Sequence, residues 1–207
     1  MLDSHPYALS FAERRGFRST EHGEQFSRLD VRKANLDGYE GVEERLRGEG
    51  IVIRTLAELG TEDKIFMQAL YELNRDSHAD IPSDVRHEFA SYDQWLKIAM
   101  IGHGRPPEWC WVALHKEKSV GIARLRLAGN NAAWNAYMGV HRACRGKGIA
   151  RALKLRAIEW SREHGVAYHY TGNDAENHRM LAINLWLGYQ LLPRDIELKR
   201  ELEAIAE

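Results

Sequence analysis

The 207-residue chain lacks several features that would place it in a special class of protein. Its two cysteines, Cys110 and Cys144, are too few for a disulfide framework and lack the spacing of metal ligands, so we expect no metal site. Its longest apolar stretch, around Trp109 to Leu114, is far shorter than the ~20 residues that span a bilayer. The N-terminus is charged where a secretory signal would be apolar. These absences favour a soluble, reduced, cytoplasmic protein without a membrane partner.

The chain also lacks an excess of either charge. Its 29 Lys and Arg balance 30 Asp and Glu, and a net charge of -1 gives no general attraction to nucleic acid or to anionic lipid. Hydrophobic residues make up 44% of the chain, which is enough for a globular core. We therefore expect no nucleic-acid partner, and the length suits one domain with an appendage or one large domain.

From residue 50 onward, apolar residues recur with the periods of strands and of helices in turn. The pattern predicts an α/β (α+β mixed) fold with a central mixed, mostly antiparallel sheet and helices on both faces. Thr61 is the expected N-cap of the first helix in this part of the chain. The expected strands are 50–56, 108–115, 120–129, 132–140, 166–171 and 189–202, and the expected helices are 62–76, 84–100, 149–165 and 178–188.

The first fifty residues resemble the end of the chain. With an offset of 172, Gly16-Phe17 aligns with Gly188-Tyr189, and each pair follows a helix end and precedes a strand. Both segments could be ordinary amphipathic helices with a glycine stop. Alternatively, residues 1–47 are the tail of a preceding copy of the domain at 48–207. The expected strand at 17–31 has an open edge, which we expect to pack on the main domain or on a partner chain, and a homodimer is one such arrangement.

The segment from Met138 to Arg151 combines a strand, a basic glycine-containing loop and a helix start. Glycines let a backbone approach a ligand closely, and N–H groups at a helix start attract anions. Residues 141–165 hold seven Lys or Arg against two Glu, which indicates a phosphate-binding face. Neither the Walker A motif nor the G-x-G-x-x-G fingerprint is present. Taken alone, the loop is equally typical of a solvated basic turn.

The context of this loop decides between the two interpretations. The pattern Arg145-x-x-Gly148-x-Ala150, after Val140 and at a helix start, resembles the acyl-CoA pyrophosphate loop of the GNAT superfamily of N-acetyltransferases. Downstream, Thr171-x-Asn173, Asn177-x-x-Met180, Ile183-Asn184 and Leu187-Gly188-Tyr189 resemble the last strand–helix–strand unit of that family. The resemblance covers about residues 50–200, and the segment at 1–33 is similar to the end of a first repeat in tandem members.

This resemblance implies an acetyl-CoA site. In the family, two neighbouring parallel strands splay apart around the pantetheine arm, and here these would be the strands 132–140 and 166–171. Backbone groups of Met138, Gly139 and Val140 would bind the pantetheine and polarise the thioester carbonyl. Asn173 and Asn177 would lie at the far edge of the arm. The pyrophosphate would be bound by Arg145, Gly146, Lys147, Gly148, Ile149 and Ala150.

The implied reaction is the direct attack of a primary amine, on a small molecule or a peptide, on the thioester in a ternary complex. In many members a Tyr four residues before the Gly-aromatic pair protonates the leaving thiolate, but this chain has Asn184 there, with Tyr137 and Tyr189 as substitutes. No general base stands out. Asp80, Asp84 and Glu88 read as helix-start residues, and His169 reads as structural.

Two functions from different classes follow. The first is an acetyl-CoA-dependent N-acetyltransferase. The alternative is a catalytically degenerate acyl-CoA-binding or interaction module, because Asn184 replaces the expected acid and no base is evident. A covalent route through Cys144 would also need a neighbouring base, and none is specified.

Overall fold

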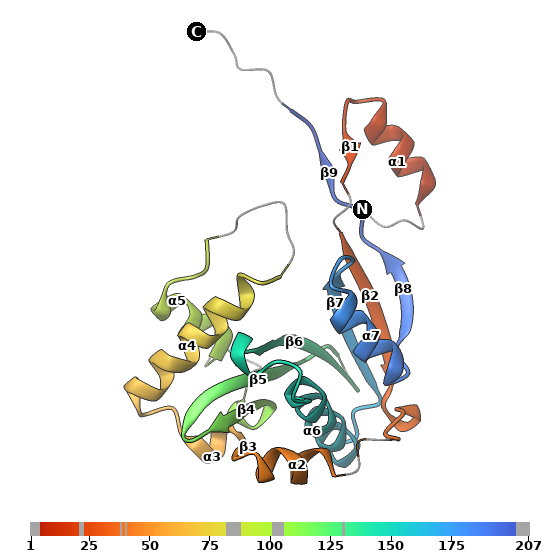
Figure 1. Ribbon diagram of the computed structural model, residues 1–207. Coiled ribbons are helices and arrows are strands. Elements are labelled where there is room, and N and C mark those ends of the chain that lie inside the picture. The colour runs from red at the N-terminus through yellow and green to blue at the C-terminus, as the bar shows by residue number, and fades with distance from the viewer. Residues whose placement is uncertain are drawn as a thin grey trace, which may run out of the picture.

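The computed structural model describes residues 5–20, 23–37, 39, 41–81, 88–100, 106–129 and 131–201. A seven-stranded sheet with the order β3-β4-β5-β6-β7-β2-β8 forms the centre (Figure 1). All its neighbouring strands are antiparallel except β6 and β7. The expected mixed, mostly antiparallel sheet is thus confirmed. The strands are β1 (Arg18–Ser19), β2 (Glu24–Asp30), β3 (Ile51–Thr55), β4 (Cys110–His115), β5 (Lys118–Leu127), β6 (Ala132–Val140), β7 (Tyr168–Asp174), β8 (Gln190–Arg194) and β9 (Leu198–Lys199).

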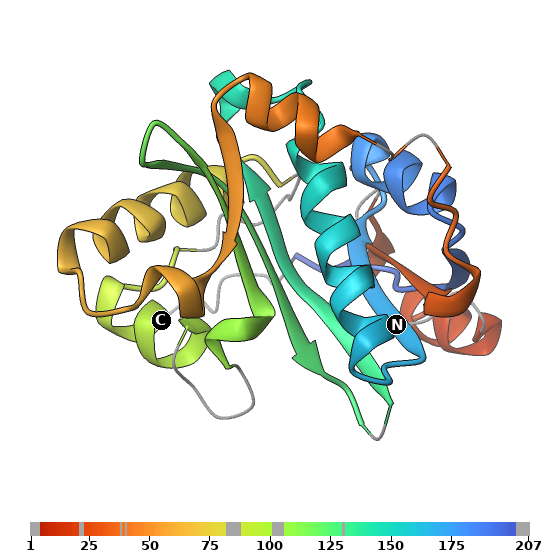
Figure 2. The ribbon, with the colours of Figure 1, turned by 90° about the horizontal axis from the view of Figure 1, so that it is seen from below.

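Helices cover both faces of the sheet, as expected. Figure 2 shows α4 and α6 on opposite sides of the strands. One core lies between α6 and the sheet and includes Leu29, Leu153 and Leu187, while the other lies under α4 and includes Met67, Leu70 and Ile122. The helices are α1 (Pro6–Glu13), α2 (Val42–Gly48), α3 (Leu56–Leu59), α4 (Lys64–His78), α5 (Tyr92–Trp95), α6 (Ile149–Glu163) and α7 (His178–Trp186), with short helical turns η1 (Val31–Lys33), η2 (Leu96–Met100), η3 (Pro107–Trp109) and η4 (Arg142–Cys144).

Several expected boundaries were wrong. Asp63, rather than Thr61, caps α4, because its carboxylate accepts hydrogen bonds from the N–H groups of Ile65 and Phe66. The expected helix 84–100 is helical only from residue 92 within its described part, where Ser91 and Gln94 form a capping box. Residues 84–87 lie outside the described residues. The long strands expected at 17–31 and 189–202 are each divided in two.

The N-terminal segment is part of the main sheet. Strand β2 lies between β7 and β8, with Phe26 opposite Gly172 and Ser27 opposite Leu191. Of the two expected arrangements, packing on the main domain or on a partner chain, the structure shows the first. The division at residues 47 and 48 stays a prediction, and hydrogen bonds of the sheet cross it.

The two ends of the chain repeat the same local structure. Gly16 after α1 and Gly188 after α7 both have left-handed backbone angles, with φ of 78° and 93°. The offset of 172 places α1 on α7, β1 on β8, and β2 on β9. Strand β2 pairs with β8, and β9 pairs with β1. Each copy's last strand therefore pairs with the other copy's preceding strand.

Candidate functional site

The parallel strands β6 and β7 separate part-way along their length. They pair only at Ala132–Tyr168, Ala133–His169 and Trp134–Tyr170, although β6 runs on to Val140 and β7 to Asp174. Figure 1 shows the two strands running apart beyond this point. We call the space between residues 135–140 and 171–174 the fork. Backbone groups that face the fork have no partner strand there, so they can bind an extended ligand.

Asn135 lies where the fork opens. Its amide nitrogen donates hydrogen bonds to the carbonyl oxygen of Tyr170 (3.2 Å) and to the hydroxyl of Tyr189 (3.0 Å). A β-bulge follows directly, because Arg124 of β5 is opposite Tyr137 whereas Leu125 is opposite Asn135. The unpaired residue of this bulge is Ala136, so the bulge and the Asn135 amide together define where the strands part.

The loop after β6 presents backbone N–H groups at the start of α6. Gly146 and Gly148 have φ of 81° and 91°, which only glycine adopts without strain. Gly148 is the N-cap of α6 and provides no side-chain cap. Within the described structure, the N–H groups of residues 146–151 have no hydrogen-bond acceptor. Six free donors at the positive end of a 15-residue helix form a surface suited to an anion.

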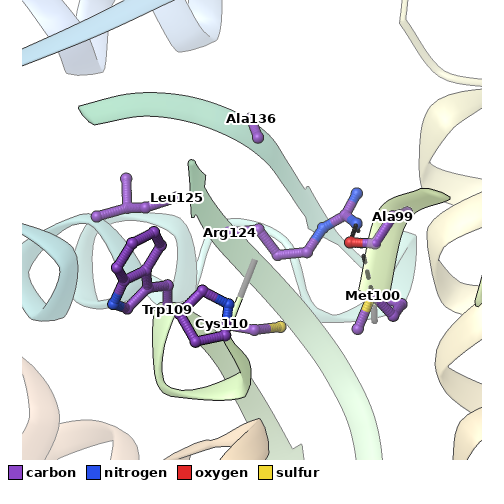
Figure 3. Close-up of a pocket in the computed structure, with 8 residues that line it drawn as sticks. Ala99, Met100, Trp109, Cys110, Arg124, Leu125 and Ala136 are labelled. Carbon is purple, nitrogen blue, oxygen red and sulfur yellow. Dashed lines mark hydrogen bonds between the residues drawn. The ribbon is translucent and has the colours of Figure 1, made fainter. Parts of the chain in front are cut away.

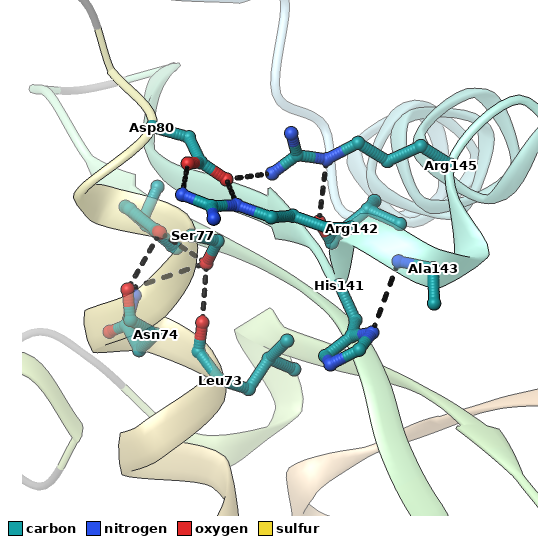
Figure 4. Close-up of polar contacts among 10 residues, drawn as sticks. Leu73, Asn74, Ser77, Asp80, His141, Arg142, Ala143 and Arg145 are labelled. Carbon is teal, nitrogen blue, oxygen red and sulfur yellow. Dashed lines mark hydrogen bonds and ion pairs between the residues drawn. The ribbon is translucent and has the colours of Figure 1, made fainter.

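Asp80, just beyond α4, holds both arginines of this loop (Figure 4). Arg142 Nε donates to Asp80 Oδ2 at 2.9 Å, and Arg145 forms an ion pair with the same carboxylate. These bonds, chiefly the one from Arg142, lower the pKa of Asp80 to about 2. Arg145 Nε also donates to the carbonyl oxygen of Val140 at 3.0 Å. Lys147 is paired with Glu49, so the three basic side chains of the loop are all held by the protein.

Tyr137 points away from the loop, toward α4. Its hydroxyl lies 2.8 Å from Ser77 Oγ and donates to the carbonyl oxygen of Asn74 at 3.1 Å. Burial raises the pKa of Tyr137. The Cβ that Gly139 lacks would lie 2.3 Å from Ser77 Oγ, so this glycine allows α4 to pack closely on β6.

Asn184 is 1% exposed on the inner side of α7. Its amide nitrogen donates to Asn173 Oδ1 at 2.7 Å, and its own Oδ1 is buried without a hydrogen bond in the described structure. The structure thus brings together two of the three expected asparagines. Asn177 instead caps α7 by accepting from the N–H of Met180.

His169 belongs to a buried polar group that sequence reasoning missed in part. Its Nε2 lies 2.6 Å from Ser161 Oγ and its Nδ1 lies 3.4 Å from the Tyr189 hydroxyl. Burial lowers the pKa of His169 to about 3 and that of the neighbouring Lys154 to about 8. Lys154 lies four residues after Ala150 and three residues before Ala157, which places it on the apolar face of α6. This spacing is the feature of the sequence from which its burial could have been predicted.

A small pocket opens beside the bulge on the α4 side of the sheet (Figure 3). Its volume is about 90 Å³, and Arg124 lines it with its Nη1 bonded to the carbonyl oxygen of Ala99 at 2.5 Å. Among the other expected residues, Glu88 is exposed and Asp84 lies outside the described residues. No group of metal-ligating side chains occurs among the residues that the structure describes.

The model of the Acetyltransferase (GNAT) family matches residues 67–189, which is more than half of the chain. The chain belongs to the GNAT acetyltransferase family. The matched region contains the fork, the basic loop and α7, while β2 lies outside it. No curated protein sequence gives a match. None of the described helices has the length and apolar character required to cross a membrane.

Solved structures of low sequence identity share this fold. A GCN5-related N-acetyltransferase from Sphaerobacter thermophilus has a TM-score of 0.68 at 20% identity, over 96% of this chain and 57% of that one. A tandem GNAT protein from the clavulanic acid biosynthesis pathway has a TM-score of 0.65 at 24% identity, over 92% and 57%. The ribosomal-protein-S18-alanine N-acetyltransferase from Escherichia coli has 0.53 at 16%, over 76% and 99%. The chain spans little more than half the length of the first two.

Proposed function

We propose that this GNAT domain is an acetyl-CoA-dependent N-acetyltransferase that acts on a primary amine in a ternary complex, in the cytoplasm. The observation that carries the proposal is the fork between β6 and β7 next to six free N–H groups at the start of α6. An extended thiol arm fits a gap between separated strands, and a pyrophosphate fits a helix start with glycines. Two further points belong to this proposal: the acceptor is a small molecule or a peptide, and two copies of the chain can form a homodimer.

Different residues of the site bind different parts of the ligand. The N–H groups of residues 146–150 bind the pyrophosphate, together with Arg145 and Lys147 when these leave Asp80 and Glu49. Met138, Gly139 and Val140 provide backbone groups along the fork for the pantetheine arm. A donor placed at the thioester oxygen stabilises the negative charge that develops there during attack.

The reaction then needs little beyond positioning and proton transfer. The amine nitrogen forms a bond to the acyl carbon, the carbon–sulfur bond breaks, and the CoA thiolate takes up a proton. Asn184 cannot act as an acid, but its pairing with Asn173 fixes β7 against α7 at the edge of the fork. In this account the thiolate is protonated by solvent or by the proton that the amine loses.

A thiol-release assay tests the proposal. We expect the protein to release free thiol from acetyl-CoA above the hydrolysis background with at least one of spermidine, tryptamine and a lysine-containing peptide. Gly148→Glu adds a side chain where φ is 91° and a negative charge where the anion binds. It should therefore lower the rate of thiol release at least about 100-fold. Far-ultraviolet circular dichroism checks that this variant is folded.

Asn184 favours one alternative, a catalytically degenerate acyl-CoA-binding module. It occupies the position at which the family resemblance implies a tyrosine acid, and it is tied to Asn173. Asn184→Tyr distinguishes the two functions. A loss of existing activity supports a role for the asparagine, whereas a gain of activity from none supports the degenerate module.

A further inference from the structure

Strand β2 adds a second set of side chains to the face of the sheet on which α4 lies. In an antiparallel pair, directly opposed residues share a face. Glu24 is opposite Asp174 and Phe26 is opposite Gly172. The Phe26 ring contacts Trp134 of β6 at a centroid distance of 6.0 Å. Trp134 in turn stacks on Tyr170 of β7 at 6.5 Å, so an aromatic surface runs from β6 across β7 to β2.

Gly172 makes room for the carboxylate of Glu24. An ideal Cβ at residue 172 would lie 2.3 Å from Glu24 Oε1 and 2.5 Å from its Cδ. The carboxylate therefore lies directly against the backbone of β7 at residue 172. The last paired residue of β7 toward β6 is Tyr170, so this position is already on the wall of the fork.

The surroundings of Glu24 suit a positively charged ligand. Glu24 is exposed, and its carboxylate has no hydrogen bond or ion pair among the described residues. Partial burial of the carboxylate raises the pKa of Glu24, and the nearby Asp195 and Asp174 raise it further. On the same face of β2, the guanidinium of Arg28 lies over the ring of Tyr168, 5.3 Å from its centroid.

The other candidate bases are occupied or lie elsewhere. Asp80 is paired with two arginines, and the hydroxyl of Tyr137 is bonded to α4. His169 is fully buried and packs against Ser161 of α6, on the opposite side of the sheet. Glu24 is thus the free carboxylate on the wall of the fork in the part of the chain that the structure describes.

We propose that Glu24 binds the ammonium group of the acceptor and acts as its general base, and that the acceptor is a primary amine with an aromatic or apolar body. This inference rests on the proposed acetyltransferase function. Glu24 takes one proton from the ammonium, and the neutral amine attacks the acyl carbon. The second proton leaves nitrogen as the carbon–sulfur bond breaks and goes to the thiolate, and Glu24 returns its proton to water. The aromatic surface of Phe26, Trp134 and Tyr170 holds the body of the amine.

Glu24→Gln in the full chain tests the proposal, with tryptamine and phenethylamine as ammonium acceptors. Loss of a general base lowers kcat/KM about 100- to 10,000-fold. Glu163→Gln, at the exposed end of α6, is the matched control and should leave kcat/KM unchanged. With aniline, whose nitrogen is already neutral at pH 7, the kcat/KM of Glu24→Gln should lie closer to that of the unmodified protein. With the ammonium acceptors, the rise of kcat/KM with pH should move to higher pH in this variant, because only amine that is already neutral in solution can then react.

Acetyl-CoA binding separates the possible failures. Glu24→Gln should keep the melting-temperature increase that acetyl-CoA gives the unmodified protein. If the unmodified protein shows no such increase, the proposed function fails. If it binds acetyl-CoA but acetylates neither amine, the acceptor class is wrong. If Glu24→Gln retains its activity, or loses it equally with aniline, Glu24 is not the base.

Discussion

At the scale of single residues, Lys154 is the least expected feature. It is 3% exposed, and no acidic side chain among the described residues pairs with it. Its ammonium nitrogen lies 5.2 Å from the centroid of the Tyr189 ring, which also carries the hydroxyl that holds Asn135. Burial lowers the pKa of Lys154 from 10.5 to about 8. At neutral pH the folded protein therefore buries a positively charged ammonium group, although burial favours the neutral amine.

Lys154→Met should therefore stabilise the protein at neutral pH. A folded-state pKa near 8 against 10.5 in the unfolded chain corresponds to about 3 kcal/mol. Between these values the unfolded chain holds more protons, so the free energy of unfolding of the unmodified protein should rise with pH, while that of the variant should not. Urea unfolding at pH of about 7 and about 9.5 measures both. Lys64→Met is the control, because Lys64 is exposed at the start of α4. If Lys154→Met is less stable than the unmodified protein at neutral pH, this explanation is wrong.

The sequence alone identified some of these residues for a physical reason. Gly146 and Gly148 stand out in the sequence because they lie in a basic loop between a strand and a helix, in a pattern that resembles the pyrophosphate loop of the family. Asn184 stands out because an asparagine in mid-helix needs a partner. Asn135 and Glu24 were not. Their roles depend on a bulge at Ala136 and on the strand opposite β7, and neither leaves a local pattern.

At the scale of elements, the position of β2 inside the main sheet is the least expected feature of the fold. It pairs with β7 over residues 24–30 and with β8 on its other edge. Its Leu29 is fully buried in the core under α6. The likeness of the N-terminal segment to the end of the chain predicted a strand there. Its pairing with β7, more than 130 residues further along the chain, leaves no local pattern in the sequence.

Leu29→Ala should destabilise the whole domain, because a cavity would form between β2 and α6. Burial of this kind is worth about 2–5 kcal/mol. Urea unfolding followed by tryptophan fluorescence should give a single transition at lower urea. Leu191→Ala on β8, where the side chain is 54% exposed, should change the free energy of unfolding by less than about 0.5 kcal/mol. Two separate transitions for Leu29→Ala would mean that β2 is not part of the cooperative unit.

At the scale of the whole molecule, strand pairing joins two copies of one motif within this GNAT domain. The α1–β1 and α7–β8 units each pair with the last strand of the other copy. The family model matches residues 67–189, while β2, which provides both a core strand and Glu24, lies outside that region. This arrangement makes the N-terminal segment part of both the fold and the proposed chemistry.

We propose that the fork and the loop of residues 145–150 bind acetyl-CoA. The most direct test is the melting temperature of the protein against rising acetyl-CoA. A ligand that binds only the folded state adds ~2.7 kcal/mol at 100-fold its dissociation constant. We predict a saturating increase that is absent in Gly148→Glu. No increase at millimolar acetyl-CoA, or an equal increase in Gly148→Glu, would mean that acetyl-CoA does not bind at this loop.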